Sequence, residues 1–442
     1  MAAPMSTRDR WTLALLVAMS FFLMADLYIT PGIVNDLAVE FGVPVSRIGF
    51  IGSAFVLVGA VVSIVFGYLT DKVSRKRLLV ATVLIGEIPC LLTGMTWATP
   101  SLGAFLALRV LTGIGIGGIY PLTFSLVSDY FGTRHRAKAC AWVEISWGLG
   151  MMVGPVLATV AVDTDYGWRL AFILAALPNF PIALAFALFA EDPRRGRSED
   201  RVAEAMDHGG VYQETIRLAD FKVIFGSRTN RLLFLQGIPG CIPWGLLPFW
   251  LIAFFETVRG FPKAQAAMIW ELFGMGAAIG LIAWAVVGDR LFQKNPKYLP
   301  LLCSAGVMAG MIPCYAIVNL PVDGTSGSAA YLFYLLAMVA GAGIAVASSN
   351  VKAMLMNVNR PEHRGSVFSV FNLADSIGKG IGPALGGMLM GFGYLVMMNV
   401  AISFWLICSL IMLLVSTTIG RDRQALLDLM ASRAEKIAGS KA

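Results

Sequence analysis

The chain contains one segment twice. His135 to Leu157 aligns without a gap on His363 to Leu385, and both copies begin with His-Arg and end with a Gly followed by Gly-Pro-x-Leu. Each copy opens with a basic loop and continues as an apolar helix, so the duplicated unit is a membrane-spanning one. Two similar halves of a membrane protein imply a site between the halves.

The composition is that of a membrane protein. Hydrophobic residues make up 57% of the chain and charged residues 14%, whereas a soluble domain carries about 25% charged residues. Because an apolar run needs about 20 residues to cross a bilayer, we expect an all-α integral membrane protein with twelve transmembrane helices in two pseudo-symmetric six-helix bundles. The expected spans cover residues 11–36, 46–70, 78–97, 101–125, 136–161, 168–190, 230–256, 264–288, 298–319, 329–355, 364–390 and 393–418.

One long hydrophilic stretch separates the two halves. It contains Asp192-Pro193-Arg194-Arg195-Gly196 and a run of mixed charges. We interpret it as a linker with a short interfacial helix around Leu218 to Phe225. The expected domains are an N-terminal six-helix bundle (1–190), a cytoplasmic linker (191–228), a C-terminal six-helix bundle (229–420) and a basic cytoplasmic tail (421–442).

The net charge of +7 is explained by membrane topology. The loops around Trp97, Asp163 and Asp323 carry few Lys or Arg, whereas the basic clusters all fall in the alternate loops. By the positive-inside rule both termini are cytoplasmic. We expect a monomer in the plasma (inner) membrane, surrounded by lipid and without a nucleic-acid partner. The clusters are Arg8 with Arg10, Lys72 to Arg77, Arg134 to Lys138, Arg194 to Arg197, Lys294 with Lys297, Arg360 with Arg364, and the tail from Arg421.

Several kinds of chemistry have no counterpart in the sequence. The six cysteines lie inside apolar runs without paired ligand spacing, and the three histidines form no HExxH arrangement. There is no Walker A sequence either. We therefore expect neither an enzyme nor a bound cofactor or metal, and any energy for transport must come from an ion gradient.

A basic loop motif resembles the major facilitator superfamily. Gly67 to Arg77 reads G-Y-L-T-D-K-V-S-R-K-R, similar to that family's G-x-x-x-D-x-x-G-R-R/K-R/K between the second and third spans, with Ser74 in place of the usual Gly. Gly67 permits close helix contact, and Asp71 can cap a helix or pair with Arg75. A degraded counterpart follows Gly288. The resemblance predicts a gate at Gly67, Asp71, Arg75, Lys76 and Asp289.

Two further motifs resemble the same family. Arg109 to Gly118 is similar to its fourth-span motif, in which an intramembrane Arg precedes a glycine-rich face, and we expect these glycines to serve helix packing. Gly150 to Pro155 resembles its antiporter motif, which favours export. Small residues let helices approach, and Pro permits a bend. The resemblance therefore adds Gly150, Gly154, Pro155, Gly382 and Pro383 to the gate.

An Arg within hydrocarbon should face a cavity or a carboxylate. At 1.5 Å per residue, Asp26 lies roughly 22 Å from the cytoplasmic end of its helix and Arg109 roughly 12 Å from the outer end of its own. In a core about 30 Å thick the two can meet. A buried carboxylate beside a cation suits the uptake and release of a proton. Asp26 is therefore our first candidate for the proton carrier, with Arg109 and Glu144 as coupling partners. A fixed structural ion pair is the alternative.

Other intramembrane charges have simpler interpretations. Asp375 and Lys379, at positions i and i+4, either contact substrate or neutralise each other. Glu87 is expected to make a local hydrogen bond, and Glu271, near the outer end of its helix, to face water.

The pocket wall is expected to be largely apolar, which favours an amphipathic ligand over a sugar. The seventh span holds several Pro and Gly residues, which predict a broken or kinked gate helix with Trp244 at the substrate. Phe124 belongs to the same wall. The predicted substrate-binding residues are Trp142, Trp147, Trp244, Phe371, Asn372, Asp375 and Lys379.

Within the superfamily, the chain resembles spinster-type lysolipid and sphingolipid transporters. The resemblance rests on Asp26, Thr30-Pro31-Gly32-Ile33, Phe41-Gly42, Arg109 to Gly115 and Pro193 to Gly196. The chain departs from that pattern at Leu27, where spinster proteins have Arg, and at Ile116, where they have Glu.

The resemblance implies a carrier that works by alternating access and couples protons to the movement of an amphipathic organic solute, with lysophospholipid as the leading example. Two alternatives stay open. One is a proton-coupled uptake symporter for an organic anion, with Arg109 and Lys379 as carboxylate partners. The other is an uncoupled lipid scramblase.

Overall fold

The computed structural model describes residues 7–70, 73–130, 133–191, 218–322, 329–360 and 363–439, and within these ranges the secondary structure is helical, without strands. Asp71 and residues 192–217 lie outside the described residues, so the gate role of Asp71 and the linker remain predictions. The chain divides into two compact units, Met1–Glu214 with Phe249–Ala253 and Thr215–Pro248 with Phe254–Ala442. The domain limits at 190 and 229 remain our proposal.

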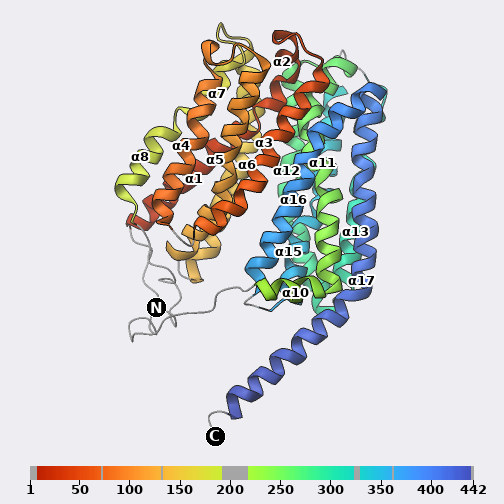
Figure 1. Ribbon diagram of the computed structural model, residues 1–442. Coiled ribbons are helices and arrows are strands. Elements are labelled where there is room, and N and C mark those ends of the chain that lie inside the picture. The colour runs from red at the N-terminus through yellow and green to blue at the C-terminus, as the bar shows by residue number, and fades with distance from the viewer. Residues whose placement is uncertain are drawn as a thin grey trace. The chain divides into compact units, whose positions relative to one another are not determined.

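The N-terminal unit is a bundle of long helices that run side by side (Figure 1). The sixth expected span is divided in two, because Pro178 directly precedes Asn179, where the second helix begins. The elements are α1 (Thr7–Leu27), η1 (Thr30–Ile33), α2 (Val34–Glu40), α3 (Val45–Leu69), α4 (Arg75–Thr93), η2 (Thr96–Ala98), α5 (Leu102–Tyr130), α6 (Thr133–Val162), α7 (Arg169–Ala176) and α8 (Asn179–Phe189).

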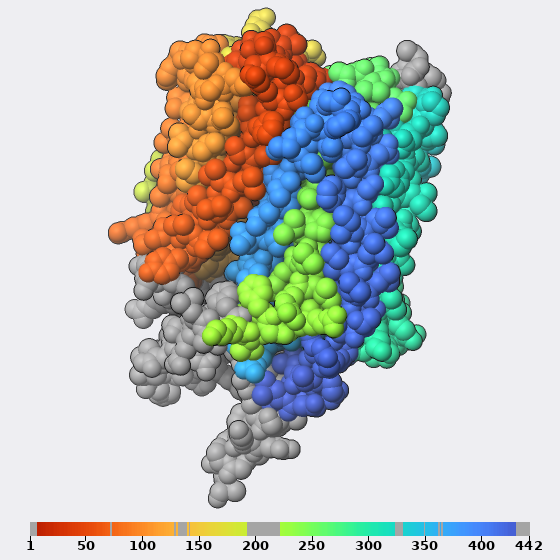
Figure 2. Space-filling model, turned by 45° about the vertical axis from the view of Figure 1, so that its right-hand side comes forward, coloured from red at the N-terminus to blue at the C-terminus, as the bar shows by residue number. Residues whose placement is uncertain are grey.

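The C-terminal unit is built in the same way, and in Figure 2 α11 is visible between α16 and α17, with α10 across its lower end. The helix expected near Leu218 is present as α10. The elements are α10 (Leu218–Gly226), α11 (Arg228–Arg259), α12 (Lys263–Lys294), α13 (Tyr298–Asn319), α14 (Ala329–Ile344), α15 (Val346–Val358), α16 (Arg364–Leu389), η4 (Met390–Phe392) and α17 (Tyr394–Gly439).

The seventh span is not broken, and a kink within it remains a prediction. α11 is one helix of 32 residues and contains Pro239, Pro243 and Pro248. Its ends are well defined: the Ser227 hydroxyl accepts a hydrogen bond from the Asn230 amide at the start, and Gly260 adopts φ 64° after the end. The prolines therefore remove backbone hydrogen bonds without ending the helix.

Within the described residues, ten helices are long and apolar enough to cross a membrane. The other two expected spans are also helical, as α4 and α16. α4 carries a basic first turn and the intramembrane Glu87, and α16 combines Asp375 and Lys379 with many Gly and Ser residues, which lowers the hydropathy of both. The prediction of an all-α integral membrane protein is confirmed.

The duplicated segment makes equivalent contacts in the two units. A Cβ atom placed on Gly150 of α6 would lie 2.4 Å from the Phe21 carbonyl oxygen of α1, and one on the aligned Gly378 of α16 would lie 2.4 Å from the Ile238 carbonyl oxygen of α11. Close backbone approach at the repeated glycines is therefore confirmed. Gly67 behaves differently, because an added Cβ would meet nothing within 4 Å. The expected close helix contact at Gly67 is therefore not found among the described residues.

Candidate functional site

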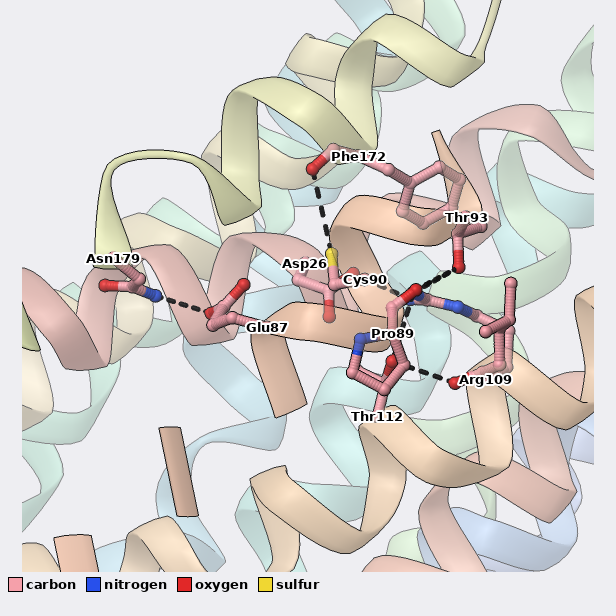
Figure 3. A network of polar contacts seen from close by, with 10 residues as sticks. Asp26, Glu87, Pro89, Cys90, Thr93, Arg109, Thr112, Phe172 and Asn179 are labelled. Atoms are coloured by element: carbon pink, nitrogen blue, oxygen red, sulfur yellow. Dashed lines mark hydrogen bonds and ion pairs between the residues drawn. The ribbon is translucent and has the colours of Figure 1, made fainter. Parts of the chain in front are cut away.

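Arg109 lies at the centre of a buried polar network in the N-terminal unit (Figure 3). Its Nη1 donates a hydrogen bond of 2.7 Å to Asp26 Oδ1, so α5 and α1 are joined by an ion pair. Its Nη2 donates to the hydroxyls of Thr93, at 2.9 Å, and Thr112, at 3.2 Å. The predicted meeting of Asp26 and Arg109 is confirmed, whereas the two threonines were not predicted.

The threonines are themselves oriented by the helix backbone. Thr93 donates to the Pro89 carbonyl at 2.8 Å, and Thr112 donates to the Leu108 carbonyl at 2.9 Å. Each hydroxyl proton is therefore committed, and a lone pair of each oxygen faces Arg109. The spacing of Thr112, three residues after Arg109, could have indicated this contact, because residues at i and i+3 share a helix face.

Aromatic rings enclose the guanidinium. Its carbon atom lies 4.6 Å from the Phe172 ring centroid and 5.9 Å from that of Phe55. Asp26 and Arg109 are exposed by only 1% and 2%, so the charge pair is screened little by solvent. Asp26 Oδ2 has no N–H or O–H donor among the described residues.

Glu87 of α4 lies beside the same network (Figure 3). It is fully buried, and its Oε1 accepts a hydrogen bond from the Asn179 amide of α8, which confirms the expected local hydrogen bond. Its Oε2 is buried without a partner among the described residues. The charges of Asp26 and Arg109 act on Glu87. The network therefore contains two carboxyl groups and one cation.

An aromatic cluster joins α5 and α6. The Tyr120 ring centroid lies 4.9 Å from that of Phe124 and 5.3 Å from that of Trp147, and Phe124 and Trp147 are 5.4 Å apart. Trp147 Nε1 is a buried donor without an acceptor among the described residues. Trp142 is elsewhere, with 56% of its surface exposed. Tyr120 was not predicted, although its position four residues before Phe124 places both on one face of α5.

In the C-terminal unit, the predicted site residues have different surroundings. The Asp375 carboxylate is acted on by the Lys379 ammonium and by the Cys241 thiol. Lys379 is exposed and Asn372 is half-buried. Phe371 is only 4% exposed and packs in the hydrophobic core. Its role as a substrate contact remains a prediction that this burial does not favour.

Trp244 of α11 packs against aromatic neighbours within the C-terminal unit. Its ring centroid lies 5.6 Å from that of Phe273 and 6.2 Å from that of Trp405. The Trp405 indole donates a hydrogen bond of 3.0 Å to the Gly240 carbonyl. The surroundings of Trp244 are those of a helix-packing residue.

The remaining predicted residues are dispersed. Glu144 and Asp289 are exposed, and Lys76 is half-buried. Arg75 Nε donates to the Thr70 carbonyl at 3.3 Å, across the loop that contains Asp71. The expectation that Glu271 faces water is wrong. It is 7% exposed, and neither carboxylate oxygen has a partner among the described residues.

Comparisons with known proteins agree with this architecture. Residues 15–328 match the model of the Major Facilitator Superfamily. The chain is 25% identical over 400 residues to the cis,cis-muconate transport protein of Acinetobacter baylyi. The alignment covers 88% of this chain and 91% of that protein. It is also 26% identical over 377 residues to the gentisate transporter of Corynebacterium glutamicum. That alignment covers 83% of this chain and 78% of the gentisate transporter.

Among solved structures, a bacterial homologue of the human lysosomal transporter Spinster is similar, with a TM-score of 0.80 at 18% identity over 95% of this chain and 99% of that chain. This likeness shows the fold.

Proposed function

We propose that this chain, a secondary transporter that belongs to the Major Facilitator Superfamily, carries small organic carboxylates in symport with protons. The similarity to transporters named for muconate and gentisate, over most of the chain, carries this proposal. Both named compounds are unsaturated carboxylates. Of the substrates that the sequence leaves open, an organic anion is therefore favoured over a lysolipid.

The proton-coupling part of the proposal rests on Asp26 and Arg109. While Asp26 is ionised, Arg109 is neutralised by a partner at 2.7 Å. A proton on Asp26 removes that compensation and leaves a buried cation, which is costly in an apolar environment. An incoming carboxylate then lowers the free energy of the protonated state. Binding of substrate and proton thereby favour each other, as symport requires.

The direction of transport is a further part of the proposal. The segment Gly150–Pro155 resembles an antiporter motif, and this resemblance favoured export. Gly150 and Gly154, however, contact α1 or the residues directly after it closely and so have a structural role. The motif needs no export function to explain it, and we propose uptake. We also propose that both termini are cytoplasmic, as the basic clusters predict, and that the transporter acts as a monomer in the inner membrane.

Two groups are proposed to contact the substrate. The Tyr120, Phe124 and Trp147 cluster offers aromatic faces for a planar unsaturated anion, and Trp147 Nε1 offers a buried donor for its carboxylate. In the C-terminal unit, Lys379 is the exposed cation of α16 that suits a carboxylate.

Exchange of radiolabelled substrate in proteoliposomes tests the proposal. We expect counterflow of cis,cis-muconate or gentisate, and a slower counterflow in Trp147→Phe, which keeps a ring and loses the N–H donor. Trp97→Phe, at an exposed position of η2, is the matched control and should exchange at the native rate. Transport of lysophosphatidylcholine with no exchange of either carboxylate would contradict the proposal, and lipid flux indifferent to a pH gradient would indicate a scramblase.

A further inference from the structure

The second carboxyl group of the buried network, Glu87, has no charged partner of its own. Its hydrogen-bond donor is the neutral Asn179 amide, and its Oε2 is unpaired among the described residues. An ionised carboxylate in such a place is strongly destabilised by the loss of hydration, which a neutral donor does not offset. A protonated Glu87 avoids this cost while the nearby cation is engaged elsewhere.

The nearby cation is Arg109, and it is engaged by Asp26. Both Nη atoms of Arg109 are used, one on Asp26 and the other on Thr93 and Thr112. α4 and α5 approach each other closely beside Glu87, because a Cβ on Gly115 would lie 2.3 Å from Gly86 Cα. Glu87 directly follows Gly86 on α4 and lies beside the network that contains Arg109 (Figure 3), and the charge of Arg109 acts on it.

The groups that face Glu87 can be named for each helix packed against it. α1 contributes Asp26 and α5 contributes Arg109, whose charges both act on it. α8 contributes the neutral Asn179. α7 contributes Phe172, whose carbonyl accepts from the Cys90 thiol on Glu87's own helix. One cation thus serves two carboxyl groups.

We propose that Glu87 is a second proton-binding residue of this transporter, and that Asp26 and Glu87 alternate as the ionised partner of Arg109. When Asp26 gains a proton and no substrate is bound, Arg109 loses its counter-charge, and Glu87 releases its own proton to supply a new one. The network then keeps zero net charge while a proton enters at Asp26 and another leaves from Glu87. An incoming carboxylate then replaces Glu87 as the counter-charge, and Glu87 takes a proton back. The inference rests on the proposed proton coupling, but its protonation states can be measured without substrate.

Infrared spectroscopy of the full-length protein at neutral pH tests the alternation, because a protonated carboxyl group has a carbonyl band that a carboxylate lacks. The native spectrum minus that of Glu87→Gln should contain this band. In an Asp26→Asn background, the same subtraction should lose it, because Glu87 is then ionised. No band in the native difference, or a band that persists with Asp26→Asn, would overturn the proposal.

Two further variants keep the test decisive. Glu271→Gln removes a buried carboxyl group of the other unit. Its effect on the infrared spectrum should therefore be the same with or without Asp26→Asn. If Glu87→Gln fails to fold, Asn179→Ala replaces it for the assignment. Loss of the amide donor should move the Glu87 carbonyl band to higher frequency, and an unmoved band would count against a protonated Glu87. If the infrared bands behave as expected but the proteoliposomes exchange no carboxylate, the proposed substrate is overturned and the alternation of Asp26 and Glu87 still holds.

Discussion

Asp26 and Arg109 lie 83 residues apart in the sequence, yet Arg109 Nη1 is 2.7 Å from Asp26 Oδ1, with side chains exposed by 0% and 2%. This ion pair joins the first helix of the N-terminal unit to the helix that carries its glycine-rich face. A buried pair of this kind is destabilised strongly when its geometry is lost, because the remaining charge stays desolvated.

The geometry at Arg109 requires a guanidinium. Arg109→Lys keeps the charge, but a single ammonium cannot reach Asp26, Thr93 and Thr112 in the same fixed arrangement. We expect the thermal unfolding midpoint of Arg109→Lys in detergent, measured by fluorescence, to be lower than that of the native protein. Thr112→Val removes one of these bonds and should cost about 1.5–3 kcal/mol, as hydrogen bonds to charged groups do. Equal midpoints for the native protein and Arg109→Lys would show that the network does not stabilise the unit.

The packing of α6 on α1 predicts that alanine substitutions at two nearby glycines change the melting temperature very differently. Gly150→Ala places a methyl group 2.4 Å from the Phe21 carbonyl oxygen, whereas Gly148→Ala meets nothing within 4 Å. Overpacking costs about 1–3 kcal/mol, so Gly150→Ala should melt earlier and Gly148→Ala should melt at or above the native temperature. The account of this interface fails if the two alanine variants melt together.

Replacement of Glu271 by an apolar residue is expected to raise the thermal stability of the protein. Both of its carboxylate oxygens are buried without partners among the described residues, and an unsatisfied buried polar group costs about 1–3 kcal/mol. Glu271→Leu should therefore raise the thermal midpoint. The matched control is Glu144→Leu, since Glu144 is exposed. A lower midpoint for Glu271→Leu would reveal an interaction of Glu271 that this structure does not contain.

The start of α11 is held by a residue of α17. Asp422 Oδ2 accepts hydrogen bonds from the Ser227 hydroxyl at 2.8 Å and from the Thr229 amide at 3.0 Å. A carboxylate at a helix N-terminus stabilises it, so Asp422→Ala should destabilise the C-terminal unit by about 1–3 kcal/mol. Asp428→Ala, which removes only an exposed contact with Gln424, serves as the control. Limited proteolysis should cleave the first variant faster, and equal rates would contradict the clamp.

The sequence predicts this fold well, because the spans are long apolar segments and the repeated glycines specify close approach. It also predicts that Asp26 meets Arg109, since helical rise alone gives the depth of each residue. Rotation of a helix about its axis is harder to predict when apolar residues cover every face. For that reason Glu271 was placed on the wrong surface, and Tyr120 was not assigned to its cluster. Glu87 was given its local hydrogen bond but not its place beside Asp26 and Arg109.

Asp26 is proposed to couple carboxylate transport to protons. The most direct test compares two rates in proteoliposomes for the native protein and Asp26→Asn: accumulation of radiolabelled gentisate or cis,cis-muconate under an inward pH gradient, and exchange of the same substrate without a gradient. We predict that Asp26→Asn abolishes accumulation and retains exchange, because exchange needs no net proton movement. Gradient-driven accumulation at the native level in Asp26→Asn would contradict the account.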